Sequence, residues 1–211
     1  MIRSGPSRAA AIGLALALAG GLGGCVTLFP KAQPEQLYRF GGEPPEAAPA
    51  AGTNVTVRSA GLGFDREAGT DRILTVRGDT LAYVQGARWA IPAQQIFEAE
   101  VERGFGVGGP VRFIPRGAPG HAPYTLRLEV MRFEARYQGA STAPPTILVR
   151  LRATLTRESD ATLAGERVFE ASEPAKENRI GAMVAAFDQA TSTAIGDMVS
   201  WVGQTATPVA G

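Results

Sequence analysis

Cysteine and histidine are almost absent from this sequence, which has one residue of each kind in 211. The lone cysteine, Cys25, excludes an internal disulfide. The lone histidine, His121, leaves a zinc site without the His and Cys ligands that such sites use, and no spacing of carboxylates replaces them. We therefore expect neither a metal ion nor a cofactor.

Charge is also scarce and nearly balanced, with 21 Lys and Arg against 20 Asp and Glu and no basic run. Nucleic-acid-binding domains neutralise phosphates with clustered Lys and Arg. The composition therefore predicts no nucleic-acid partner. The length suits one domain of usual size with flexible tails.

Long hydrophobic runs are missing apart from Ala9–Leu18, which follows Arg3 and Arg8 and precedes small residues. This is the three-part pattern of a secretory signal. The run is too short to span a bilayer, which takes roughly 20 apolar residues. We expect residues 1–24 to be a signal peptide that is removed.

The expected cleavage site carries more specific information. The string Leu22-Gly23-Gly24 stands directly before Cys25 and resembles the bacterial lipobox, in which the cysteine thiol receives a diacylglyceryl group. Lipidation accounts for a lone cysteine in an oxidising compartment, and two or three acyl chains anchor stably. Val26 in place of Asp favours the outer membrane by the enteric sorting rule. We expect Cys25 to be lipidated and the domain to face the periplasm; an ordinary secreted protein with a stray cysteine is the alternative.

The hydrophobic periodicity of the remaining chain predicts strands, a helix, strands and a second helix. The expected strand 124–137 changes phase at Met131, which indicates a bulge. Asn178 is the expected N-cap of the last helix. Strands are expected at 54–58, 72–76, 80–84, 110–115, 124–137, 147–156 and 163–171, and helices at 91–105 and 179–202. This order predicts an α+β fold with an antiparallel or mixed sheet of about five to six strands and two helices packed on one face.

The segment boundaries follow from composition. Residues 25–52 are expected to form the lipidated cysteine and a flexible tether, with Leu37–Phe40 as a candidate short strand inside it. Residues 53–203 form the α+β domain, and 204–211 a tail. Fully extended, such a tether would reach at most about 90 Å.

Motifs that carry chemistry are weak. The G-x-G-x-x-G string at 104–109 follows an expected helix and precedes a strand, the reverse of a dinucleotide site. His121 lies in a Pro- and Gly-rich loop, and no nucleophile motif accompanies it. The glutamates at 98, 100 and 102 do not share one face of a helix. We expect no enzyme activity, with a periplasmic hydrolase built on His121 as an alternative.

One local feature stands out between the expected hairpin and the first helix, where Tyr83, Arg88 and Trp89 gather. Aromatic and arginine side chains are enriched in contact surfaces. These three residues are therefore candidates for a partner or lipid surface. Trp89 in the core is the other interpretation.

Several features follow one another along the chain: the lipobox, Leu37-Tyr38-Arg39-Phe40, Val55-Thr56-Val57, Leu81-Ala82-Tyr83-Val84, Arg88-Trp89-Ala90-Ile91-Pro92 and the last helix. Taken together, they resemble the auxiliary lipoproteins of ABC-type transporters, including the paraquat-inducible and MCE-associated lipoproteins. The resemblance implies a non-catalytic subunit that works with an MCE-domain protein, a permease and an ATPase in moving lipids or hydrophobic compounds between two membranes. It implies no catalytic residue.

The leading hypothesis is therefore a lipoprotein subunit of a lipid-transport complex, held to a membrane through acylated Cys25. A lipoprotein assembly factor for outer-membrane or envelope components is the alternative. The sequence also leaves a homo-oligomer open.

Overall fold

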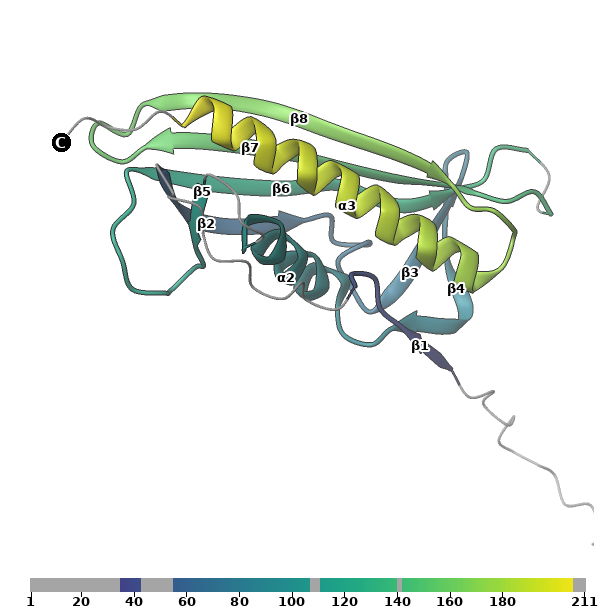
Figure 1. The fold of residues 1–211 in the computed structure, drawn as a ribbon. Coiled ribbons are helices and arrows are strands. Elements are labelled where there is room, and N and C mark those ends of the chain that lie inside the picture. Colours follow the sequence, from purple (N-terminus) through teal and green to yellow (C-terminus); the bar gives the residue numbers. More distant parts are fainter. Residues whose placement is uncertain (1–34, 43–54, 107–110, 140–141, 207–211) are drawn as a thin grey trace, which may run out of the picture. The chain divides into compact units, whose positions relative to one another are not determined.

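The computed structural model describes residues 35–42, 55–106, 111–139 and 142–206. These residues form an eight-stranded mixed sheet with two helices on one face (Figure 1). The expected α+β class is confirmed, and the sheet has more strands than the five to six expected. The elements are β1 (Gln36–Tyr38), β2 (Val55–Phe64), β3 (Arg72–Arg77), β4 (Thr80–Trp89), α2 (Ala93–Gly106), β5 (Val111–Ile114), β6 (Tyr124–Arg136), β7 (Thr146–Arg157), β8 (Leu163–Pro174) and α3 (Ile180–Thr205).

The sheet divides at β6. On one side, β6 pairs with β7 and β7 with β8, both antiparallel. On the other side, the first half of β6 pairs in parallel with β2, which carries β5, and its end pairs in parallel with β3. β3 then carries β4, and β4 carries β1. One long strand thus supports two separate arms.

A bulge in β6 allows both halves of this strand to direct their apolar side chains into the same core. The register to β7 shifts between Val130 and Arg132, so the phase change expected at Met131 is confirmed. Val130 faces the core before the bulge, and Phe133 faces it after the bulge. Without the extra residue, strand alternation would point Phe133 to the opposite face.

The regular patterns of β7 and α3 form as predicted. On β7, the five alternating apolar residues from Ile147 to Leu155 are fully buried. α3 buries an apolar stripe that includes Met183, Phe187 and Met198. The N-cap prediction is wrong: Arg179 occupies that position without a side-chain cap, and Asn178 instead accepts a hydrogen bond from the Tyr137 hydroxyl at 2.9 Å.

α2 approaches α3 closely where a glycine lies between them. A Cβ on Gly104 would lie 2.6 Å from Cγ2 of Ile195, well inside contact distance. The glycine therefore permits the helices to pack together over the sheet. Neither described helix is both long and apolar enough to cross a membrane.

The core centres on the ring of Phe133. Five other aromatic rings lie around it, each from a different segment, at centroid distances of 4.7–6.1 Å. Edge-to-face and tilted pairs at this spacing add to the energy of burial. The five rings are those of Phe40, Phe64, Trp89, Phe97 and Phe187.

The domain begins earlier than the composition indicated. Residues 35–42, which were expected to lie in the tether, pack on the domain: β1 pairs with β4, and Phe40 is 3% exposed. α3 continues to Thr205, past the expected helix end at 202 and the expected domain end at 203. The proposed signal peptide, Cys25 and the other expected boundaries lie outside the described residues.

We expect Phe133→Ala to lower the free energy of unfolding by about 3–5 kcal/mol, because it removes a buried ring that six segments share. Urea unfolding followed by circular dichroism measures this loss. Val168→Ala, at a side chain 40% exposed on β8, is the control and should change stability by less than about 0.5 kcal/mol. Similar losses in the two variants would contradict the central role of the ring.

Candidate functional site

The segment from Glu35 to Gly42 forms a strap across the corner where β4 leads into α2. Its three-residue strand β1 pairs in parallel with the end of β4, with Tyr38 opposite Trp89. Just past the paired residues, the Ala90 N–H donates to the Tyr38 carbonyl at 2.7 Å. The strap is therefore part of the sheet.

Charged side chains fix the outer side of this corner. Arg88 makes an ion pair with Glu35 of the strap and another with Asp71 at 3.1 Å. The side chains of Arg88, Glu35 and Asp71 are each 40–44% exposed. Exposed ion pairs of this kind contribute little free energy of folding. These two pairs therefore orient the strap but add little to its stability.

The inner end of the strap is held by burial and by both helices. Phe40 packs edge-to-face on Trp89 at 5.1 Å. The Gly41 N–H donates to the Asp188 carboxylate of α3 at 2.7 Å. A Cβ on Gly41 would lie 1.7 Å from the Glu100 carboxylate of α2, and its φ of +86° favours glycine. Only glycine fits between the two carboxylates.

Glu100 has an unusual environment for a carboxylate. Its side chain is 13% exposed, and Oε1 has no hydrogen-bond partner among the described residues. Burial raises the pKa of Glu100, Arg103 partly offsets this rise, and Asp188 adds to it. The environment beside the strap therefore disfavours the ionised form of Glu100 relative to water.

The three predicted surface residues separate at this corner. Trp89 is 1% exposed and belongs to the core, so the alternative interpretation holds for its ring. Tyr83 is half-buried and donates its hydroxyl to the Glu67 carbonyl at 3.2 Å. The Arg72 guanidinium lies 4.0 Å from the Tyr83 ring centre, and Arg72 stands opposite Arg88 in the sheet. Tyr83 and Arg88 thus share one outer surface through Arg72.

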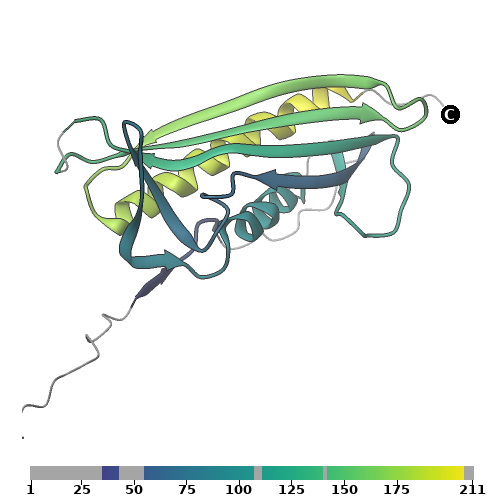
Figure 2. The same ribbon diagram turned by 180° about the vertical axis from the view of Figure 1, so that it is seen from behind.

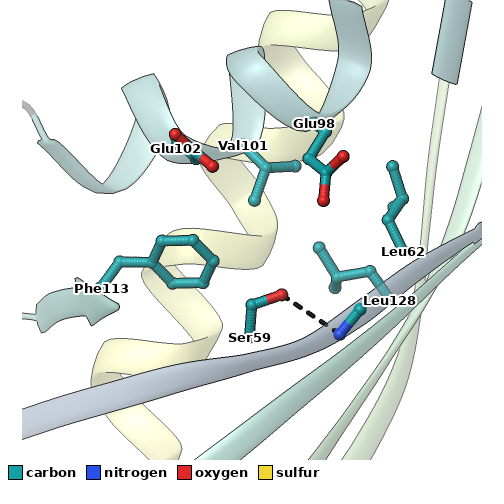
Figure 3. A pocket seen from close by; sticks show the side chains of 8 residues that line it. Ser59, Leu62, Glu98, Val101, Glu102, Phe113 and Leu128 are labelled. Atoms are coloured by element: carbon teal, nitrogen blue, oxygen red, sulfur yellow. Dashed lines mark hydrogen bonds between the residues drawn. The ribbon is translucent and has the colours of Figure 1, made fainter. Parts of the chain in front are cut away.

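A crevice between α2 and β2 is lined by apolar side chains, with two glutamates at its α2 rim (Figure 3). Figure 3 shows Val101, Phe113 and Leu128 around it, with Glu98 and Glu102 above. Its volume is about 10 Å³. This is the space of about one water molecule, far too small for an acyl chain.

The other candidate groups lie apart. His121 is exposed in the loop between β5 and β6, and Glu100 faces the strap rather than the rim that carries Glu98 and Glu102. Within the described part of the chain, no three His, Cys, Asp or Glu side chains group as metal ligands. Sequence reasoning missed the contacts of Gly41 with Glu100 and Asp188, because pairs so distant along the chain leave no local signal.

We expect Glu100→Gln to raise stability at neutral pH. The pKa of Glu100 is higher in the folded protein than its ordinary value of 4.5, so protonation of this carboxyl stabilises the folded state. This stabilisation is fully present below pH 4.5 and is lost as the pH rises through the folded-state pKa. The gain should therefore shrink as pH is lowered. Thermal unfolding across pH measures it, with Glu102→Gln, exposed on the same helix, as the control. A gain that does not depend on pH would contradict this origin.

Comparison with known proteins places this fold. A family model described as ABC-type transport auxiliary lipoprotein component matches residues 68–199. A crystal structure of a Xanthomonas campestris protein, assigned to the family model DUF330, is 26% identical with a TM-score of 0.65 and covers 82% of this chain and 94% of its own. A crystal structure of an uncharacterized protein is 13% identical with a TM-score of 0.61, covering 80% of this chain and 99% of its own, and shows the fold alone. No curated protein matches.

The family match extends from the loop before β3 to the last turns of α3 and includes Tyr83, Arg88 and Trp89. It covers more than half of the chain and confirms the resemblance inferred from the sequence. The chain belongs to the family of ABC-type transport auxiliary lipoprotein components.

Proposed function

We propose that this protein is a non-catalytic auxiliary subunit of an MCE-type ABC transport system that moves lipids or hydrophobic compounds between the inner and outer membranes. The family match over residues 68–199 carries this proposal. The lipobox-like string before Cys25 supports anchoring in the outer membrane with the domain facing the periplasm. An MCE-domain protein, a permease and an ATPase are the proposed partners.

The strap shortens the reach of the proposed anchor. Because Glu35 and the residues after it pack on the domain, only the chain between Cys25 and Glu35 remains as a tether. Fully extended, that chain spans roughly 33 Å at about 3.3 Å per residue, against the 90 Å expected for the longer tether. The domain would then work close to the membrane that holds its lipid.

The corner beside the strap is the surface we propose for a partner or lipid contact. Tyr83 and Arg88 contribute to it together with Arg72, while Trp89 supports it from the core. The tether joins the domain here, since Glu35 pairs with Arg88. A contact at this corner would therefore form within the reach of the anchor.

Replacement of the lipidated residue tests the anchoring. We expect the wild-type protein to fractionate with the outer membrane and, after cross-linking, to capture an MCE-domain protein, whereas Cys25→Ser is released and captures much less. Density-gradient fractionation and mass spectrometry of the captured proteins measure this. Capture of outer-membrane assembly factors without any MCE protein would favour the assembly role and overturn the proposal.

A second experiment tests the corner. We expect Arg88→Ala to lower capture of the MCE-domain protein several-fold, because arginine is enriched among the few contact residues whose truncation costs more than about 1 kcal/mol. Arg112→Ala is the control, since Arg112 is exposed on β5, at the other end of the strand path from β1. Equal capture by both variants, with unchanged unfolding midpoints, would remove the corner from the contact surface.

A further inference from the structure

The face of β6, β7 and β8 that points away from α3 is covered by neither of the two described helices, as Figure 2 shows from behind. We call it the open face. Strand alternation places mostly polar and charged side chains on it, with Leu148 and Val168 among them, opposite the fully buried row of β7. Its two halves differ in how these charges are paired.

In the half nearer the start of β6, charges across the strands are complementary. Glu129 stands opposite Arg152 in the register and accepts from it at 3.2 Å. Thr154 stands opposite Glu166 and donates to it at 3.0 Å. Such cross-strand pairs are the normal way in which an exposed sheet face satisfies its polar groups.

In the other half, Arg150 of β7 stands opposite Glu170 of β8 on one side and opposite a second arginine, Arg132 of β6, on the other. The register places Arg132 of β6 against Arg150 of β7, and Arg136 follows on the same face of β6. Directly opposed like charges are unfavourable in a sheet. An anion that accepts hydrogen bonds from two guanidinium groups offsets repulsion of this kind.

The carboxylates near these arginines leave most of the donors unused. Arg150 lies 3.6 Å from Glu170, and Arg132 lies 3.8 Å from Asp65, beyond hydrogen-bond distance. Arg136 donates from Nε to Glu134 at 2.7 Å, and Arg132 donates from Nη1 to the Met131 carbonyl at 2.9 Å. The remaining N–H groups of the three side chains, each 43–49% exposed, make no hydrogen bond within the described part of the chain.

The three arginines line one hollow of about 340 Å³. The hydroxyl-bearing residues Thr146 and Ser172 also line it, and Glu170 lies at its β8 side. A hollow of this size is at the lower end of the range of small-molecule sites. Its lining combines the N–H donors of three arginines with a single carboxylate, that of Glu170.

We propose that this hollow binds a phosphate group. Guanidinium groups form paired hydrogen bonds with phosphate oxygens, and a tetrahedral anion can receive donors from more than one side, as the arrangement of Arg132, Arg136 and Arg150 requires. A planar carboxylate offers two oxygens and engages fewer of them. The phosphate belongs to a lipid headgroup or to a soluble phosphate, and the site does not depend on the transport role proposed above.

Titration with inorganic phosphate at constant ionic strength tests the site. The full mature chain is used with Cys25→Ser, so that no acyl chain interferes. We expect a saturable rise in the unfolding temperature, because a ligand that binds only the folded state stabilises it. Arg150→Gln should weaken the binding about tenfold, as for the loss of one charge-assisted contact. Arg152→Gln, two residues along the same face and outside the hollow, should leave the binding unchanged.

Flotation with vesicles identifies the source of the phosphate. Binding to phosphatidylcholine vesicles that contain phosphatidylglycerol, weakened by Arg150→Gln and not by Arg152→Gln, assigns a lipid headgroup. Phosphate binding without flotation assigns a soluble phosphate. Either result supports the site. It is overturned if phosphate gives no saturable shift, if both arginine variants lose the binding equally, or if only an acidic peptide binds.

Discussion

The structure depends on one ring, that of Phe133, because six segments meet there. Its neighbours come from the strap, β2, β4, α2 and α3, at centroid distances of 4.7–6.1 Å. The two arms of the sheet and the helix layer are therefore not independently packed units. Phe40 is one of these neighbours, so the segment that would carry the lipid anchor is attached through the centre of the core, and the exposed ion pairs of Arg88 only orient it.

Burial of the strap has an electrostatic consequence. Gly41 lies between Asp188 of α3 and Glu100 of α2, and the absence of a side chain allows both carboxylates to approach its backbone. Asp188 gains a hydrogen bond from this approach, while Glu100 becomes desolvated and its Oε1 has no hydrogen-bond partner in the described part of the chain. Close packing of the strap at Gly41 thus disfavours ionisation of the Glu100 carboxyl.

Much of the fold could be predicted from periodicity, because periodicity reports which face of an element is buried. The alternation of β7, the stripe of α3 and the phase change at Met131 were all visible in this way. The short strand β1 was visible only as an aromatic cluster, and the Pro- and Ala-rich residues after it favoured a tether. The sequence did not show which strands pair, because the parallel pairings of β6 with β2 and β3 join segments separated by α2 and at least two other strands. The corner was found by its residue types, yet sequence could not tell that Trp89 points inward while Arg88 points outward.

The hollow on the open face follows from the same irregularity that builds the core. In regular antiparallel pairing, Met131 would stand opposite Arg150, and Arg132 would point into the apolar interior. The bulge moves the register by one residue, which brings Phe133 to the centre of the core and Arg132 to the open face against Arg150. Alternation alone indicates the face of each arginine, but only the register shows that two positive charges are opposed. The core therefore requires the bulge, the bulge creates the opposed arginines, and a bound phosphate is the ligand that relieves their repulsion without disturbing the packing beneath.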